Sequence, residues 1–342
     1  MSRVSVIVPA RNEEQNLEPL VRSLSKQDNV REIIVVDDQS EDATPRILEQ
    51  LGKEIPALRA VRIDFLPEGW IGKNYALHIG ARAATGEWLL FTDADTRHQP
   101  GSLTAILERA QEENADLLSL SPGQEARTWW EKSVIPLVYV EAAKLYPYEE
   151  VSRPDSPEAA ANGQYILIRR EAYERAGGHE ALRNDVLEDV ALARRVKACG
   201  GRLTFLLGRP WVRTRMYEHF GDMWEGWSKN LYLLYKKSLV QILAEVASLC
   251  LLDLAPFFGL LFSFHLRTRP AQEVWAAACI SILAWRHLAY MRSLAQAQFS
   301  RRIAVYRIPG AAIYSCLLLN SARRYLWTEQ IKWKGRSYGV KS

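Results

Sequence analysis

The sequence predicts an α/β protein with a mostly parallel sheet, followed by a C-terminal helical region embedded in a membrane. Short, β-branched apolar runs alternate with helical segments over the first 237 residues, and long apolar stretches begin at residue 238. Polar clusters also follow the apolar runs at regular intervals. We therefore expect one α/β domain over 1–237, membrane helices over 238–326 and a basic cytosolic tail over 327–342.

Strands and helices are expected in strict alternation. Alternation of this kind is typical of a parallel sheet with helices on both faces. The expected strands are 3–9, 32–38, 58–63, 88–93 and 115–121, and the expected helices are 15–26, 42–51, 73–84 and 101–113. Further along, 161–178 has the pattern of a strand, a short helix and a Gly turn, and 184–201 contains another helix.

A polar cluster follows each of the first four strands. The clusters read PARNEE, DDQSED, LPEGWIGKN and DADTRH. Ligands of parallel α/β sheets bind just beyond the carboxyl ends of the strands, which lie on one edge. A single solvated turn would explain any one cluster, but four together predict one binding site along this edge.

Within DADT, Asp93 and Asp95 are one residue apart. In an extended segment such side chains point to the same side, so both carboxylates can converge on one centre. Carboxylate oxygens suit Mg²⁺ or Mn²⁺, and the spacings of the cysteines give no zinc-like ligand set. We expect a metal at Asp95 and Asp93, where it would neutralise a diphosphate.

A phosphate is also expected near Lys73, which begins a predicted helix after two glycines. Free amide groups and partial positive charge at a helix N-terminus favour anions, although the glycine spacing is not that of a Walker A motif. Asp93 is expected to contact the nucleotide-sugar as well. The other residues expected around the nucleotide are Pro9, Arg11, Asn12, Glu13, Asp37 and Asp38.

The second half of the domain is expected to handle the acceptor. Glu188 and Asp189 open the helix within 184–201. Acids in a first helical turn are also what simple capping produces. Next to a nucleotide site, one of them is a candidate general base for an acceptor hydroxyl. Gly163 and Gln164 are expected on the same acceptor side.

Taken in order, VSVIVPARNEE, VVDDQSEDAT, FTDADT and LEDVALARRV resemble inverting family 2 glycosyltransferases of the Rossmann-like GT-A fold. The resemblance covers about residues 3–237 and is specific as a combination, although each motif is short. It implies that Asp93 and Asp95 bind the metal and the donor diphosphate, and that Asp189, beside Glu188, is the catalytic base. GWIGKNYAL looks like a segment of members that glycosylate ceramides, carotenoids and hopanoid-related lipids.

One departure from the family concerns the segment after the Glu-Asp acids. Polysaccharide synthases and ceramide glucosyltransferases carry Gln/Arg-x-x-Arg-Trp there, whereas this chain reads FGDMWEGWSKNLY, more like bacterial carotenoid glycosyltransferases. The difference argues against processive polymer synthesis. Trp227 and Lys229 are still candidates on the acceptor or diphosphate side. Alternatively, Trp227 simply packs or lies at a membrane interface, as do Trp224 and Tyr232.

Membrane attachment is predicted from the apolar stretches 238–264, 274–285 and 308–320, which have basic flanks. With no signal peptide, a cytosolic N-terminus and a basic C-terminus, an even number of spans is required. We expect two spans plus one re-entrant or interfacial helix, most plausibly the third, although three spans or a soluble helical subdomain are alternatives. The segment 128–147 is either an amphipathic helix at the bilayer or a helix buried against the catalytic domain.

These expectations describe a multi-pass enzyme of a bacterial-type cell membrane with a cytosolic catalytic domain. It would transfer a sugar, with inversion, from a nucleotide-sugar, chiefly a UDP-sugar, to the hydroxyl of a carotenoid, hopanoid-related or ceramide-like lipid. The net charge of +4 gives no reason to expect nucleic acid as a partner.

Four alternatives stay open. They are a polyprenyl-phosphate sugar transferase, a polysaccharide synthase, a nucleotidyltransferase and a non-catalytic nucleotide-binding protein. The first would need extra cations near the acceptor loop, for which Arg169, Arg170 and Arg183 are available.

Overall fold

The computed structural model describes residues 3–266, 268–328, 330–333 and 336–339. The chain forms two compact units, which are considered separately. One comprises Met1–Gly123 with Tyr146–Arg215, and the other Gln124–Leu145 with Met216–Ser342. The units thus divide at Arg215, and the segment before Tyr146 groups with the C-terminal helices. The functional boundaries at 237 and 326 stay predictions.

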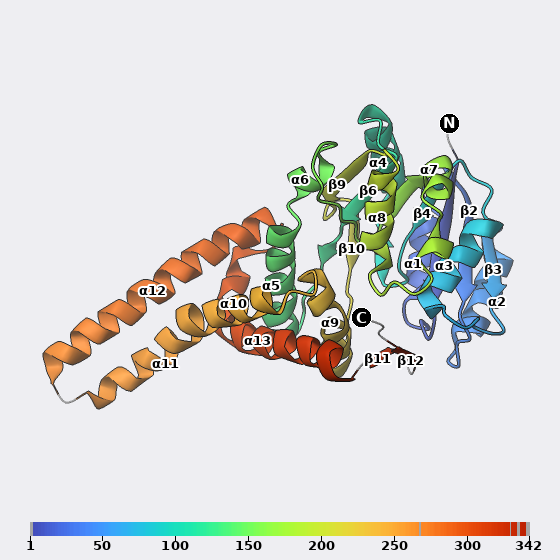
Figure 1. Ribbon diagram of the computed structural model, residues 1–342. Coiled ribbons are helices and arrows are strands. Elements are labelled where there is room, and N and C mark those ends of the chain that lie inside the picture. Colours follow the sequence, from blue (N-terminus) through green and yellow to red (C-terminus); the bar gives the residue numbers. More distant parts are fainter. Residues whose placement is uncertain (1–2, 267, 329, 334–335, 340–342) are drawn as a thin grey trace. The chain divides into compact units, whose positions relative to one another are not determined.

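A seven-stranded sheet forms the centre of the first unit, in the order β3-β2-β1-β4-β8-β6-β9 (Figure 1). The parallel neighbours β3, β2, β1 and β4 occupy one side, and β8 runs antiparallel between β4 and β6. The strands are β1 Val4–Ala10, β2 Val30–Asp37, β3 Leu58–Arg62, β4 Trp88–Phe91, β6 Leu117–Ser121, β8 Ile166–Arg169 and β9 Leu203–Leu207. The predicted, mostly parallel α/β fold is confirmed.

Helices cover both faces of this sheet. They are α1 Leu17–Leu24, α2 Thr44–Glu54, α3 Gly72–Ala83, α4 Ser102–Glu112, α6 Tyr148–Ser152, α7 Arg170–Arg175 and α8 Glu188–Ala198, with the 3-10 turn η1 His179–Leu182. A smaller sheet contains β5 Thr96–His98, β10 Val212–Thr214 and β7 Gly123–Gln124. Antiparallel pairing of β5 with β10 fixes the chain immediately after Asp95.

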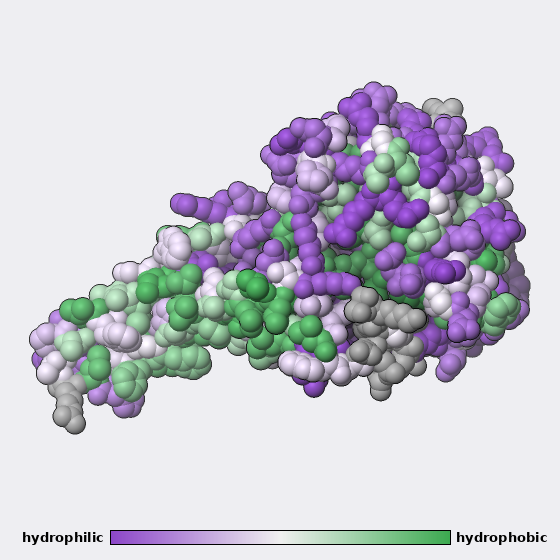
Figure 2. Space-filling model, viewed as in Figure 1, coloured by the Kyte–Doolittle hydropathy of each residue, from purple (hydrophilic) through white to green (hydrophobic). Residues whose placement is uncertain are grey.

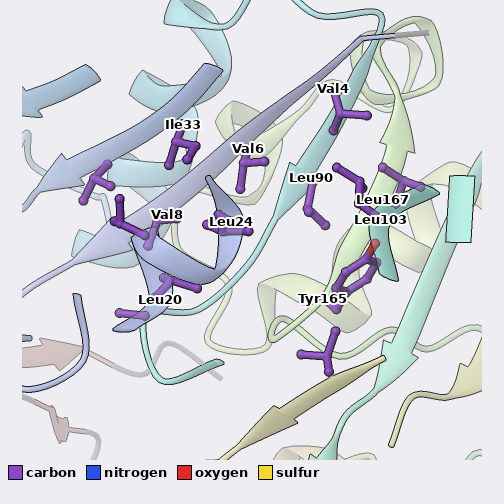
Figure 3. Packing of buried hydrophobic residues seen from close by; sticks show 14 of the residues in the cluster. Val4, Val6, Val8, Leu20, Leu24, Ile33, Leu90, Leu103, Tyr165 and Leu167 are labelled. Carbon is purple, nitrogen blue, oxygen red and sulfur yellow. The ribbon is translucent and has the colours of Figure 1, made fainter. Parts of the chain in front are cut away.

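The period-two alternation of β1 determines which face each helix covers. Val4, Val6 and Val8 point into the core beneath α1 and α4, beside Leu24 and Leu103 (Figure 3). Ile7 points to the opposite face. There α3 approaches so closely that a Cβ on Gly80 would overlap the Ile7 side chain. The strand is therefore buried on both faces, and this burial holds the carboxyl edge rigid.

The second unit is helical. Its elements are α5 Trp129–Leu145, α9 Phe220–Leu234, α10 Leu239–Leu249, the π-helical turn η2 Cys250–Leu254, α11 Ala255–Phe262, η3 Ser263–His265, α12 Arg269–Gln296, η4 Arg301–Tyr306, α13 Arg307–Arg323, η5 Arg324–Thr328 and the hairpin β11 Gln330–Trp333 with β12 Arg336–Gly339. Helix α5 is buried against α9 and α13, with Val134, Leu137 and Val138 in the core. Burial was one of the two alternatives for this segment, but its partners are helices of the second unit and not the sheet domain.

Three continuous helical stretches are long and apolar enough to cross a membrane: Leu239–His265, Arg269–Gln296 and Arg301–Thr328. Helices α11 and α12 lie side by side and carry a surface of apolar side chains (Figures 1 and 2). The Trp275 indole N–H ties them together through the carbonyl oxygen of Gly259, at 2.8 Å.

Three charged residues inside these stretches pair with one another. The Asp253 carboxylate, 1% exposed, accepts hydrogen bonds from Arg286 at 2.7 Å and Arg307 at 3.0 Å. Arg307 also lies over the ring of Tyr290. Pairing is required because an isolated charge in an apolar environment is strongly unfavourable.

Candidate active site

The carboxyl edge of β1, β2, β3 and β4 gathers the clusters that follow these strands, because all four strands are parallel. The loops after β1 and β2 are joined by hydrogen bonds. Arg11 donates to the carbonyl oxygen of Asp38 at 2.8 Å, and the backbone N–H of Asn12 donates to the Ser40 hydroxyl at 2.9 Å. The Asn12 side-chain oxygen in turn accepts from the backbone of Glu41. The two loops therefore form one surface.

Several predicted nucleotide residues have structural partners in this surface. Asp37 is buried and accepts the backbone N–H of Ser40 at 2.9 Å, and the backbone N–H of Glu13 donates to Thr44 Oγ1 at 2.9 Å. Pro9 lies within β1, paired with Val36 of β2. Ser40 and Thr44 were not predicted. The signal available for them was a Ser or Thr just after a pair of strand-ending acids.

Lys73 lies at the centre of the site, in the first turn of α3. Its Nζ is 2.8 Å from Asp93 Oδ1 and 2.8 Å from Glu188 Oε1. Burial by itself would lower the pKa of Lys73, but the two carboxylates more than offset this and hold the pKa well above its usual value. Lys73 thus links the metal acid predicted after β4 to the acids that open α8.

A bound cation would relieve the electrostatic repulsion between the carboxylates of Asp95 and Asp93. Desolvation, the Asp93 charge and the Glu13 charge raise the pKa of Asp95 to about 7. Asp95 Oδ1 is buried and has no hydrogen-bond partner. No group of three or more His, Cys, Asp or Glu side chains that could hold a metal occurs among the described residues. A site with two carboxylates instead fits a hard cation that takes its remaining ligands from a diphosphate.

Asp189 lies beside this cluster. Its Oδ2 accepts the backbone N–H of Gly163 at 2.9 Å, and its Oδ1 accepts the N–H of Val190 at 2.8 Å. Desolvation and the charge of Glu188 raise the pKa of Asp189 to about 6, against the opposing effect of Lys73. A carboxylate with this pKa is ionised near neutral pH and is a stronger base than an exposed aspartate.

The segment before α8 is attached to the start of α3. The backbone N–H of Ile71 donates to the carbonyl oxygen of Arg183 at 2.7 Å, and Asn74 Nδ2 donates to the carbonyl oxygens of Leu182 and Asp185 at 2.6 and 2.9 Å. Asn74 was not predicted as a site residue. These bonds fix the backbones that carry Lys73 and Glu188, so any adjustment between them must be made by side chains.

The predicted acceptor residues fall into two groups. Gly163 touches the charged cluster, and the next residue, Gln164, is buried and accepts the Thr92 hydroxyl at its carbonyl oxygen. Trp227 and Lys229 belong to α9 of the other unit, where Trp227 packs between the rings of Tyr139 and Tyr217. Packing was one of the alternatives for Trp227, and an acceptor role for either residue stays a prediction.

Gly163 leaves room for the charged cluster, and its replacement provides a direct test. A Cβ at this position would lie 3.1 Å from Lys73 Nζ and 3.4 Å from Glu188 Oε1. Gly163→Ala is therefore expected to displace the lysine by a few tenths of an ångström and to lower kcat by about tenfold, since catalysis is sensitive to small misplacements. Turnover and the melting temperature are measured together.

Gly52→Ala in α2 is the matched control, because nothing lies within 4 Å of its added Cβ. It should leave kcat unchanged and stabilise the helix slightly. If Gly163→Ala turned over as fast as Gly52→Ala, tight packing at Gly163 would not matter for the reaction.

Two curated relatives are similar to this chain over nearly its whole length. A 4,4'-diaponeurosporenoate glycosyltransferase of Staphylococcus haemolyticus (strain JCSC1435) is 29% identical over 348 residues, covering 99% of this chain and 89% of the relative. Its namesake in Staphylococcus aureus (strain USA300) is 24% identical, covering 98% and 88%.

A solved mannosyltransferase from Pyrobaculum calidifontis, in complex with GDP-Man and Mn²⁺, has the same fold. The TM-score is 0.56 at 21% identity, covering 96% of this chain and 88% of that one. The family profile of Glycosyl transferase family 2 matches residues 5–177, more than half of the sequence. The chain therefore belongs to glycosyl transferase family 2.

Proposed function

We propose that this glycosyltransferase transfers a sugar from a nucleotide-sugar to a membrane lipid of the carotenoid type. The observation that carries the proposal is the cluster of Lys73, Asp93, Glu188 and Asp189 beside Asp95. One side of it faces the strand-end loops suited to a nucleotide, and the other side holds a carboxylate suited to a base. The donor is proposed to be a UDP-sugar, and GDP-mannose is tested beside it because the solved mannosyltransferase holds GDP-Man.

On the donor side, Asp93 and Asp95 would hold Mg²⁺ or Mn²⁺. The partnerless Oδ1 of Asp95 and the raised pKa of its carboxyl both support a cation at this position. When bound, such a cation supplies positive charge that stabilises the leaving diphosphate. Lys73, at the N-terminus of α3, adds a second positive charge on the same side.

On the acceptor side, Asp189 would take the proton from the acceptor hydroxyl. The two backbone N–H groups that hold its carboxylate fix its orientation before the acceptor arrives. The acceptor oxygen would then attack the anomeric carbon on the face opposite the leaving diphosphate, which inverts the configuration. No covalent sugar–enzyme bond is needed, because the base and the leaving group lie on opposite sides.

The names of the curated relatives raise a second possibility for the acceptor group. The word diaponeurosporenoate in these names carries the suffix of a carboxylate, and a carboxylate is already ionised and needs no base. A hydroxyl is favoured here because Asp189 is well suited to remove a proton near neutral pH.

A phosphate acceptor is less well supported than it was by sequence alone. Arg169 pairs in register with Trp88 at the beginning of β4, which is the edge opposite the site, and stacks on that tryptophan at 4.6 Å. The side chain of the adjacent Arg170 donates to the carbonyl oxygen of Gly86. Only Arg183 of the three arginines lies near the start of α3.

The catalytic unit is proposed to lie on the cytosolic side, with two membrane crossings. The stretches from Glu245 to His265 and from Glu273 to Arg292 are each about 20 residues, or roughly 30 Å as helix, which matches the hydrocarbon core. Their internal charges, Asp253 and Arg286, pair with each other.

The third candidate helix is proposed not to cross. In its apolar window 44% of residues are buried inside the protein, against 22% and 11% in the other two. Green fluorescent protein fused after residue 342 should fluoresce and alkaline phosphatase fused there should be inactive, because an even number of crossings leaves both ends in the cytosol. The opposite pattern would mean an odd number of crossings.

The activity itself is tested by expressing the full chain in bacterial membranes. UDP-glucose, UDP-GlcNAc and GDP-mannose are each supplied with a hydroxylated carotenoid, a carotenoid acid, a ceramide or a polyprenyl phosphate. Mass spectrometry should find the sugar on the hydroxylated carotenoid. Product only from polyprenyl phosphate, or a polymer, would contradict the proposed acceptor, and no transfer from any donor would contradict the activity.

A further inference from the structure

One lysine neutralises acids on both sides of the site. Lys73 Nζ is within 2.8 Å of Asp93, expected to bind metal, and of Glu188, which opens the acceptor-side helix. An ammonium group has three N–H donors, and two of them are directed at these carboxylates. On a third side the Gly163 backbone covers it, because a Cβ there would be 3.1 Å from Nζ.

A divalent cation on Asp93 and Asp95 would be repelled by the lysine in this arrangement. Such a cation lies about 2.1 Å from a carboxylate oxygen. Lys73 Nζ is 2.8 Å from Asp93 Oδ1, so a cation on either oxygen of this carboxylate would lie close to a second positive charge in a partly buried site. Asp95 has no such occupant, since its Oδ1 has no hydrogen-bond partner. The lysine therefore competes at one of the two proposed metal ligands and leaves the other open.

We propose that Lys73 is an exchangeable counter-ion that leaves Asp93 when metal and donor bind and then contacts the donor diphosphate. This proposal rests on the proposed function. Before metal and donor bind, the ammonium group of Lys73 neutralises the negative charges of Asp93 and Glu188. After metal and donor have bound, Lys73 retains its ion pair with Glu188 and donates the released N–H to a phosphate oxygen of the donor. The site thereby resists metal alone and accepts metal together with a nucleoside diphosphate.

The surrounding backbone supports a movement of the side chain alone. The first turn of α3 is bonded to the segment 182–185 through Ile71 and Asn74, so the Cα of Lys73 is held in place. The Lys73 side chain is 32% exposed and is long enough to turn between neighbouring anions. Glu188, at 10% exposed, is the less mobile partner and is expected to retain the lysine.

The test measures binding without turnover, in the purified full chain. Mn²⁺ affinity is measured by electron paramagnetic resonance without nucleotide, and affinity for UDP and for GDP by equilibrium dialysis with Mg²⁺ present. Lys73→Met should bind Mn²⁺ about tenfold more tightly, because the competing cation is gone, and bind the nucleotide about tenfold more weakly, because a phosphate contact is gone. Lys73→Arg, which keeps the charge, should lie closer to wild type in both.

Lys53→Met is the matched control. Lys53 also pairs with a glutamate at 2.8 Å, but both side chains are about 70% exposed on α2. Neither affinity should change, because an exposed pair contributes little. Melting curves of all variants show that they are folded.

Changes of opposite sign are the signature of exchange. If Lys73→Met weakened Mn²⁺ and nucleotide binding together, or changed neither, the lysine would be structural and the proposal would be overturned while the proposed function stood. If the wild type bound neither UDP nor GDP, the proposed function would fail, and the exchange with it.

Discussion

Asp189→Asn is expected to lower kcat by about 10²–10⁴-fold, the usual contribution of a positioned general base. Asparagine keeps the size of the side chain, but its single carbonyl oxygen can accept only one of the N–H groups of Gly163 and Val190, which bind to different oxygens of the carboxylate. It cannot accept a proton from the acceptor. Binding of the nucleotide should therefore change little, and the loss should be seen in kcat, measured as glycosylated lipid by mass spectrometry.

The pH profile gives an independent check. The pKa of Asp189 is raised to about 6, so the wild-type rate should fall as pH drops through that value and the carboxylate is protonated. The residual rate of Asp189→Asn should lack this decline. With a carotenoid acid as acceptor the variant should lose little, because no proton has to be removed.

Glu188→Gln distinguishes the two neighbouring acids. Glu188 is engaged by Lys73 at 2.8 Å, whereas Asp189 is held by backbone N–H groups. Replacing Glu188 should lower kcat less than replacing Asp189, and it should move the decline to a pH below 6, because the Glu188 charge that raises the pKa of Asp189 is gone. A larger loss for Glu188→Gln than for Asp189→Asn would assign the base to Glu188.

The first half of the fold could be predicted because buried parallel strands have a distinctive pattern. Their β-branched runs, such as VSVIVP, place side chains on two covered faces, and the acids that follow them mark the carboxyl edge. The direction of β8 could not be predicted. ILIR is as apolar as its parallel neighbours, and its antiparallel pairing with β4 and β6 depends on contacts far apart in the sequence.

The same limit applies to the site. Sequence spacing placed Asp93 beside Asp95 and Glu188 beside Asp189, because each pair is local. The sequence predicted a phosphate near Lys73. It could not show the ion pair between Lys73 and Glu188, because this pair depends on the packing of the segment 182–185 against α3. Composition also left α5 undecided, since an apolar helix with scattered charges suits a bilayer or a core.

Asp95→Asn should change stability and activity in opposite directions: the variant should be more stable at high pH but should lose turnover. In the metal-free protein the folded-state pKa of about 7 lies above the ordinary value of 3.8, so folding disfavours the carboxylate. This destabilisation is absent at pH values below the ordinary pKa and grows until pH exceeds 7. An uncharged asparagine should therefore raise the melting temperature at pH 8 and change it little at pH 4.

The same substitution should remove the metal. Loss of even an outer-shell partner weakens metal binding about 10–100-fold, so loss of a direct ligand should cost at least about 100-fold in Mn²⁺ affinity. Turnover should fall to the level of the wild type in excess chelator. Asp155→Asn is a control outside the site, because this exposed acid pairs with Arg153. If Asp95→Asn kept wild-type Mn²⁺ affinity, its buried, partnerless oxygen would not be a metal ligand. The raised pKa of Asp95 would then reflect only its burial and the charges of Asp93 and Glu13.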